Sequence, residues 1–327
     1  MITDIVIGLQ HGDEGKGKVT HHLLKSGEYT HCIRFNGGQN AGHAIYHNGD
    51  KIVTHAIPAG VFFNVKSIIG SGCVLNIDKL YGEIDKLTSA GVDVMSNLKI
   101  AANAHIITED HLNEDAKDNS IGTTKSGNGP AYRDKYARRG VRAGDIGDLR
   151  PFLVDMVEEL YYSDEKTAVL MEGAQGFWLD PDWGDYPFVT SSHCGVAAAL
   201  QNGITPRSLR DVWGIAKIYE TYVGKRTFQP EGEVFENIQK VGKEFGATTG
   251  RVRQCNWLNM RQLLQAFVMN GVNRLIFNKM DVLQEVGEWG ISSPDRMFNS
   301  EDEMTEYLES VFSPHAEVFF SSSPEFV

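Results

Sequence analysis

The sequence predicts an α/β protein with a mostly parallel central sheet and flanking helices. Short apolar runs typical of buried strands recur along the chain, several are followed by a glycine-rich loop, and amphipathic helical stretches lie between them. The first unit, residues 2–18, is a strand, a glycine-rich loop and a helix of phosphate-loop type. Long loops of low apolar content interrupt the pattern later, and such loops in a compact domain are usually functional.

The elements expected from apolar periodicity follow one another along the chain. Strands are predicted at residues 2–8, 31–35, 51–56, 67–70, 99–102, 168–171, 212–219, 274–277 and 318–320. Helices are predicted from Lys16 to about Lys25, from Asn76 to Gly91, over 150–162, over 258–269 and near 301–311. The second of these is the best marked, because Asn76 can cap its start and Gly91 can end it. No repeat or linker divides the chain, so we expect residues 1–327 to form a single domain.

The loop after the first strand carries the strongest motif. Gly12, four further residues and then Gly17-Lys18 fit the phosphate-loop pattern, in which backbone N–H groups and a helix N-terminus hold phosphates. Val19 stands where that pattern has a Ser or Thr ligand for Mg²⁺, and Asp13 lies inside the loop. A carboxylate there is costly unless a cation or a proton transfer uses it. The loop is therefore predicted to bind a nucleotide, with Asp13 in a chemical role. The alternative is a surface glycine loop with solvated charges.

Two further glycine-rich turns follow predicted strands. Residues 36–43 contain Asn40 and His43, and residues 172–176 contain Gln175. Ligands of open α/β sheets bind at the carboxyl ends of the strands, so these polar groups are predicted to face one cleft. An isolated histidine is more often a packing or surface residue, but the neighbours of His43 favour a functional role.

Loops rich in Gly, Thr and Arg offer sites for anions. Residues 117–147 include Thr124 and Arg138, whose hydroxyl and guanidinium groups suit a phosphate monoester; a solvated basic loop is the alternative. Thr190 is a further predicted phosphate donor. Residues 246–253 hold two arginines and two threonines, which suit a dicarboxylate as well as a phosphate.

The strand at 274–277 ends in a guanine-reading pattern, Asn278-Lys279-Met280-Asp281. A carboxylate there can accept from guanine N1–H and the 2-amino group, a donor pair that adenine lacks. Four residues are weak evidence alone, but together with the phosphate loop they favour GTP.

Composition excludes several classes of protein. The chain has 327 residues, 41% of them hydrophobic, with 31 Lys and Arg against 43 Asp and Glu and a net charge of -12. That balance argues against a broad nucleic-acid or membrane surface. Four scattered cysteines form no CxxC motif and favour a reducing cytosol. No signal-peptide pattern is seen, and no apolar run approaches the ~20 residues of a membrane span. We therefore expect a cytoplasmic protein with no nucleic-acid or membrane partner.

The order of the motifs resembles one family, adenylosuccinate synthetase. The matching segments are residues 12–18, 40–43, 121–124, 129–132, 137–140, 172–176, 186–187, 189–192, 245–251 and 279–283. They lie in the family's order and cover nearly the whole chain. The resemblance implies a carbon–nitrogen ligase that joins L-aspartate to C6 of a 6-oxopurine nucleotide. GTP would be the phosphoryl donor, Mg²⁺ the cofactor, and GDP and phosphate the by-products.

The resemblance also implies a role for each matching residue. Asp13 would remove the purine N1 proton, His43 would donate to the transferring phosphoryl group, Gln175 would hold the 6-oxygen, and Lys16 would stabilise the γ-phosphate. Residues implied to bind GTP are Gly12, Glu14, Gly15, Lys16, Gly17, Lys18, Lys279, Asp281, Ser322, Ser323 and Pro324. Those implied for the purine nucleotide are Asn40, Thr124, Arg138, Gln175, Thr190, Val223 and Arg251. Those implied for aspartate are Thr249, Arg251 and Arg253, and those for the metal are Asp13 and the Gly42 carbonyl. Arg138 resembles a residue that reaches the neighbouring subunit's site, so a homodimer is implied.

Departures from the family pattern concern the acceptor. The usual Arg-Val-Gly-Ala-Gly-Pro-Phe-Pro-Thr-Glu loop is Tyr222-Val223-Gly224-Lys225-Arg226-Thr227-Phe228-Gln229-Pro230-Glu231 here, and the chain is short. Both features resemble a phage branch that uses dGMP and would act in the host cytoplasm, whereas Asp13 and residues 279–281 resemble the GTP-using form. We expect dGMP as acceptor, with IMP close behind. The alternative from another class is a GTPase-like regulator, which leaves Gln175, His43 and the 249–253 arginines without a role.

Overall fold

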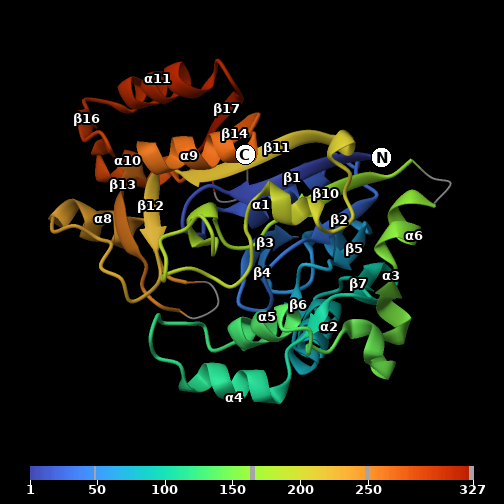
Figure 1. The fold of residues 1–327 in the computed structure, drawn as a ribbon. Coiled ribbons are helices and arrows are strands. Elements are labelled where there is room, and N and C mark those ends of the chain that lie inside the picture. Colours follow the sequence, from blue (N-terminus) through green and yellow to red (C-terminus); the bar gives the residue numbers. More distant parts are fainter. Residues whose placement is uncertain (48, 163–165, 247–249, 324–327) are drawn as a thin grey trace.

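The computed structural model describes residues 1–47, 49–162, 166–246 and 250–323. A central sheet of nine strands runs through the molecule in the order β17-β14-β11-β1-β10-β2-β5-β7-β9, and each neighbouring pair in it is parallel (Figure 1). Its strands are β1 (Ile2–Gly8), β2 (His31–Arg34), β5 (Lys66–Ile69), β7 (Leu98–Ala101), β9 (Leu153–Val154), β10 (Ala168–Glu172), β11 (Leu209–Lys217), β14 (Arg274–Asn278) and β17 (Glu317–Ser321). The predicted α/β class with a mostly parallel sheet is confirmed.

Three smaller sheets surround the central one. Four strands lie in the order β12-β13-β15-β16, which are Tyr219–Tyr222, Gln254–Asn259, Trp289–Ser292 and Arg296–Phe298. An antiparallel hairpin joins β3 (His43–His47) to β4 (Asp50–Thr54), and β6 (Val74–Leu75) pairs with β8 (His105–Ile106). The predicted strand at 51–56 therefore belongs to this hairpin and not to the central sheet.

Helices occupy the connections between the parallel strands. The α-helices are α1 (Lys16–Leu24), α2 (Ile77–Ser89), α3 (Val94–Asn97), α4 (Glu109–Lys117), α5 (Asn128–Tyr136), α6 (Met156–Tyr161), α7 (Val196–Leu200), α8 (Glu233–Val241), α9 (Met260–Asn270), α10 (Met280–Val286) and α11 (Glu301–Phe312). Short 3₁₀ helices are η1 (Ala59–Phe63), η2 (Ala143–Asp145), η3 (Gly147–Phe152), η4 (Phe177–Leu179) and η5 (Pro206–Ser208). Figure 1 shows α9 to α11 beside β14 and β17, α8 beside β12 and β13, and α2, α3 and α6 at the side of β5 and β7. Among the described helices, none combines the length and the apolar character that a bilayer span requires.

Helix α2 forms where its capping residues predict it. The Asn76 side chain accepts from the Lys79 amide, and Leu80, Ile84 and Leu87 are buried on one face. The N-cap supplies one of the orphan amides of the first turn with an acceptor, and the apolar stripe fixes the helix on the core.

Two local predictions are wrong. The continuous helix expected over 150–162 is instead η3, the edge strand β9 and the short α6, because Pro151 lies in the segment and Leu153 and Val154 pair with β7. The loop expected over 117–147 contains α5, which buries Ala131 and Tyr132 in a small second core.

Candidate active site

The carboxyl ends of β1, β2, β10, β14 and β17 meet at one edge of the parallel sheet, and the predicted motifs follow these strands. The phosphate loop between β1 and α1 comes first. Its residues Gly12, Asp13 and Gly15 have φ of 92°, 61° and 98°, a left-handed backbone that glycine adopts most readily. Gly17 lies against His43, where a Cβ would come within 2.8 Å of the histidine Cβ. The loop therefore depends on its glycines for both conformation and close packing.

Glu14 turns inward beneath this loop. Its carboxylate has no exposed surface, and its Oε1 accepts from the backbone N–H groups of Gln10 at 3.2 Å and Gly12 at 2.8 Å. The Lys16 ammonium is 2.5 Å from the other oxygen. The Glu14 side chain thus shapes the loop and orients Lys16. Because that side chain is occupied, only the backbone of Glu14 is able to contact a nucleotide.

His43, at the start of β3, belongs to a buried ion cluster with Arg34 and Glu172. Its Nδ1 donates to Glu172 Oε1 at 2.5 Å, and its Nε2 is 3.2 Å from Arg34 Nη1. Glu172 also accepts from Arg34 Nη2 at 2.8 Å and from the Ala59 amide at 2.8 Å. Burial and the Arg34 charge lower the pKa of His43 to about 4, against the opposing influence of Glu172. Burial alone would raise the pKa of Glu172, but Arg34 and His43 lower it to about 2. The cluster therefore holds a carboxylate, a guanidinium and a neutral imidazole.

Gln175 projects from the turn after β10 with a positive φ of 59°. Its Nε2 donates to Asn40 Oδ1 at 3.2 Å, and its Oε1 accepts from the Ser192 hydroxyl at 3.3 Å. The structure thus brings together the two turns that the sequence assigned to one cleft, at residues 40 and 175, and adds Ser192 to them.

Asp13 ends a chain of alternating charges. Its Oδ2 is 2.8 Å from Arg253 Nε, and Arg253 Nη1 is 2.6 Å from Glu244, which is 2.9 Å from the Lys217 ammonium. Glu244 and Lys217 are buried. Burial opposes ionisation of Glu244, but the charges of Lys217 and Arg253 lower its pKa to about 2. The predicted base and a predicted aspartate ligand are therefore in direct contact.

The segment predicted to read guanine, residues 278–281, lies beside the phosphate loop. Asn278 donates to the Glu14 carbonyl at 2.8 Å, and Lys279, at a φ of 71°, donates to the Gly242 carbonyl at 3.1 Å. Asp281 is exposed in the first turn of α10. On the neighbouring strand β17, where Ser321 pairs with Asn278, the Ser321 hydroxyl accepts from the Lys18 ammonium at 2.7 Å, and the Ser323 carbonyl accepts from it at 2.9 Å. Burial lowers the pKa of Lys18 to about 8. Ser322 is exposed after β17.

The remaining predicted residues lie around this centre. Thr124 donates to the Ser126 hydroxyl at 3.1 Å, and Arg251 donates to the Gly122 carbonyl at 2.8 Å. Five of these remaining predicted residues are partly buried, namely Gly42, Thr124, Thr190, Val223 and Arg251. Arg138 is exposed just beyond α5 and has a φ of 63°. Among the described residues, no recorded hydrogen bond or ion pair joins it to the other predicted site residues. The predictions for Thr249 and Pro324 lie outside the described residues.

Sequence reasoning missed the buried charges that support these groups, namely Arg34, Glu172, Lys217 and Glu244. The available signal was a charged residue closing an otherwise apolar strand, as Arg34 closes β2 and Glu172 closes β10. Such a charge almost always has a buried partner, but the partner lies in another strand and cannot be named from the sequence.

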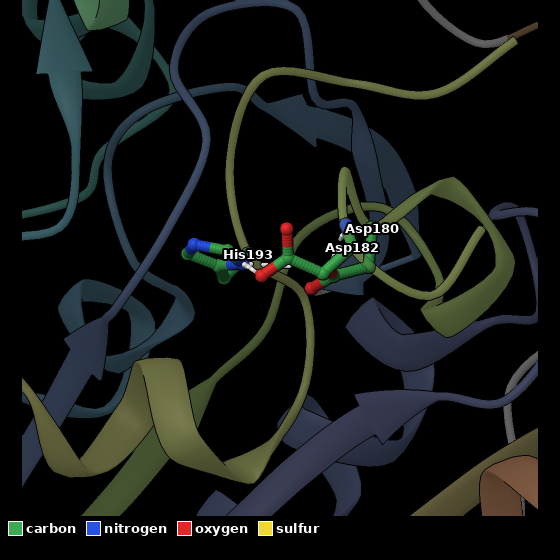
Figure 2. A group of neighbouring side chains, drawn as sticks. All are labelled: Asp180, Asp182 and His193. Atoms are coloured by element: carbon green, nitrogen blue, oxygen red, sulfur yellow. Dashed lines mark hydrogen bonds and ion pairs between the residues drawn. The ribbon is translucent and has the colours of Figure 1, made fainter. Parts of the chain in front are cut away.

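A second group of polar side chains, Asp180, Asp182 and His193, lies on the segment that follows β10 (Figure 2). His193 Nδ1 is 3.3 Å from Asp180 and 3.8 Å from Asp182. Both Asp180 oxygens accept backbone amides, from Asp182 at 2.9 Å and Cys194 at 2.7 Å. The group thus organises the turn, and it includes neither of the predicted metal ligands.

The family model that describes adenylosuccinate synthetase matches residues 5–152 and 146–310 of this chain. The chain belongs to the adenylosuccinate synthetase family. The synthetase of Helicobacter pylori strain HPAG1 is 37% identical, with 87% of this chain and 80% of the relative covered. That of Cytophaga hutchinsonii is 38% identical, with 92% and 82% covered.

Solved structures share the fold. The fully ligated adenylosuccinate synthetase of Plasmodium falciparum has a TM-score of 0.80 and 29% identity, covering 90% of this chain and 82% of its own. The cyanophage S-2L succinoaminodeoxyadenylate synthetase, bound to dGMP and dATP, has a TM-score of 0.79 at 21% identity and covers 99% and 93%. The latter likeness concerns the fold alone. The protein is therefore a carbon–nitrogen ligase of the adenylosuccinate synthetase family, a family that uses GTP, aspartate and a nucleoside monophosphate.

Proposed function

We propose that the protein joins L-aspartate to C6 of IMP, with GTP as phosphoryl donor, and releases adenylosuccinate, GDP and phosphate. The observation that carries the proposal is the position of Asp13. It lies inside a phosphate loop, with 32% of its side chain exposed, and it contacts Arg253, a predicted aspartate ligand. A GTPase-like regulator needs no carboxylate shared between a phosphate site and a second ligand.

The first step makes the purine oxygen a good leaving group. The 6-oxygen attacks the γ-phosphorus of GTP, a new O–P bond forms, the bond to the GDP oxygen breaks, and the N1 proton passes to Asp13. Lys16 and the loop amides stabilise the charge on the transferring group. Gln175 holds the 6-oxygen. Donation from His43 Nε2 to the transferring group would require the loss of its contact with Arg34 and the gain of a proton on Nε2, because the neutral ring carries its single proton on Nδ1.

In the second step, the aspartate amine attacks C6, a C–N bond forms, the C–O bond breaks, and phosphate leaves and takes up the proton that the amine loses. Arg253 and Arg251 suit the aspartate carboxylates because a guanidinium can form two parallel hydrogen bonds with each. Arg253 already holds the Asp13 carboxylate at 2.8 Å, so a substrate carboxylate of the same chemistry would compete for it.

Mg²⁺ fits the donor set at this site. The carboxylate of Asp13 and the carbonyl of Gly42 are hard oxygen ligands of the kind that Mg²⁺ prefers. His55 donates to the neighbouring Ala41 carbonyl at 2.7 Å, which helps to fix the backbone before Gly42. When bound, the ion would reduce the negative charge of the phosphates.

IMP now ranks before dGMP as the acceptor. The relatives at 37 and 38% identity are named for adenylosuccinate, whereas the dGMP-bound phage enzyme, at 21% identity, supports the fold alone. dGMP remains the second candidate because of the altered loop at 222–231, which includes the predicted nucleotide residue Val223.

The test compares acceptors at equal concentration. The purified protein, GTP, Mg²⁺ and aspartate are incubated with IMP, GMP or dGMP, and phosphate release and product mass are measured. IMP is expected to give adenylosuccinate. Turnover with dGMP alone would reverse the order of the candidates. GTP hydrolysis that ignores both aspartate and nucleotide would overturn the ligase proposal.

A further inference from the structure

His11 lies within the phosphate loop, yet the proposed chemistry gives it no role. Its side chain is fully buried, with Nε2 2.9 Å from Asp185 Oδ2 and Nδ1 3.5 Å from Glu220 Oε2. Two carboxylates from two other segments thus converge on one imidazole that is one residue from Gly12.

Arg226 completes this group from the loop after β12. Its Nη1 is 2.6 Å from Asp185 Oδ2 and its Nη2 is 3.3 Å from His11 Nε2. Its guanidinium carbon lies 4.9 Å from the Tyr222 ring centroid and 5.4 Å from that of Phe228. A planar guanidinium on aromatic faces that also bonds a carboxylate is held in one orientation.

The aromatic rings pack on the histidine as well. The His11 ring is 5.9 Å from Tyr222 and 5.1 Å from Phe228, in edge-on arrangements. The anchoring cluster, defined as His11, Asp185, Glu220 and Arg226, therefore joins the phosphate loop, the segment leading to Thr190, β12 and the loop at 223–231.

Two residues predicted for the acceptor nucleotide lie on the joined segments. Val223 is three residues before Arg226, and Thr190 is five residues after Asp185. We propose that Arg226 and His11, held together by Asp185, are positioning residues that fix these two segments against the phosphate loop and so set the KM for the acceptor. The inference rests on the proposed function, since it concerns the acceptor side of that site.

Kinetics of the full-length enzyme test the inference. Arg226→Ala is expected to raise the KM for IMP about tenfold, with kcat within about threefold of wild type and the KM for GTP unchanged. Arg226→Lys should recover part of the loss, because an ammonium can still pair with Asp185 but cannot also reach His11 in the fork geometry. Arg261→Ala, at an exposed arginine of α9, is the matched control and should match wild type.

A double-mutant cycle tests whether Arg226 acts through Asp185. Residues in one network give non-additive effects, so Arg226→Ala combined with Asp185→Asn should raise the KM little more than Arg226→Ala alone. Additive effects, an unchanged KM for IMP in a folded Arg226→Ala protein, or an equal rise in the KM for GTP would each overturn the inference.

Hydrogen exchange of the ligand-free protein separates this inference from the proposed function. Amides of 223–231 should exchange faster in Arg226→Ala and in Asp185→Asn than in wild type, while those of β1 keep their rates. If wild type rejects IMP, the proposed acceptor is wrong, and the exchange data still decide the role of the cluster. Unchanged exchange at 223–231 would overturn it.

Discussion

Arg34, His43 and Glu172 show how single residues determine what this site can do. Each closes or begins a strand, and the three come from β2, β3 and β10 to form one buried cluster. The sequence identified His43 from its glycine-rich neighbourhood. It could not identify Glu172 as the partner, because 129 residues separate the two and no local pattern links them. Contiguous motifs such as residues 12–18 and 278–281 were visible because their function lies in local spacing.

Replacement of Asp13 by Asn should reduce turnover about 10²- to 10⁴-fold, the usual contribution of a general base. Asn keeps the size of the side chain but cannot accept the N1 proton. GTP binding, measured by calorimetry, should persist because the loop glycines and Lys16 are unchanged. The exposed Asp182→Asn is the control; near-normal turnover of Asp13→Asn would remove this residue from the mechanism.

Replacement of Glu172 by Gln should lower the free energy of unfolding by roughly 3–5 kcal/mol, because it leaves the buried Arg34 charge without its carboxylate. Urea denaturation monitored by circular dichroism measures this change. Glu309→Gln, at an exposed position in α11, should have little effect. A loss no greater than that of the control would show that Arg34 finds another partner or water.

At the scale of secondary-structure elements, the position of the phosphate loop follows from the strands around it. β1 is buried along nearly its whole length and pairs in parallel with β10 and β11, so α1 must start at the carboxyl edge of the sheet. Apolar periodicity was sufficient to predict these strands. It failed for the four-stranded sheet of β12, β13, β15 and β16. These strands are only three to six residues long, and several of their residues are partly or fully exposed. Short strands of that kind carry too little period-2 signal to be separated from loops.

The packing of α1 on β3 can be tested at Gly17. Gly17→Ala should place a Cβ 2.8 Å from the His43 Cβ, displace β3 and reduce turnover, with a stability loss of roughly 1–3 kcal/mol. Gly82→Ala is the matched control in α2, because a Cβ there meets nothing within 4 Å. That variant should be stabilised by roughly 0.5–1 kcal/mol. Thermal unfolding and activity assays of both variants measure the contrast, and equal behaviour of the two would contradict the close packing.

Two buried carboxylates of the site, Glu172 and Glu244, predict that the stability of the protein depends on pH. Against the effect of burial, the neighbouring positive charges lower the pKa values of Glu172 and Glu244 from the ordinary carboxyl value of 4.5 to about 2. A lowered carboxyl pKa means that the folded state binds protons less readily than the unfolded chain. The stabilisation is therefore present above about pH 4.5 and is lost as the pH falls towards 2, by up to roughly 3 kcal/mol for each group. Urea midpoints between pH 7 and 3 measure it, and Glu244→Gln should flatten the curve; an unchanged slope would contradict the assignment.

At the scale of the whole molecule, the family and the fold were predictable because the motifs occur in one order over nearly the whole chain. The position of the loop at 222–231 against the phosphate loop was not predictable. Tyr222, Phe228 and Arg226 pack on His11, a contact between residues more than 200 positions apart that no local pattern encodes.

The implied homodimer leads to a prediction about two defective subunits. Arg138 is exposed, as expected of a residue that serves a neighbouring site. If it does, Arg138→Leu in one chain and Asp13→Ala in the other disable the same site of a mixed dimer. One site then receives both defects, while the other has an intact Asp13 and an intact Arg138 from the opposite chain. Mixing the two inactive variants should restore activity, up to about one quarter of wild type when half the dimers are mixed. Steady-state turnover after mixing measures it, with each variant alone as the control. If sedimentation shows mixed dimers but activity is not restored, Arg138 does not act across the interface.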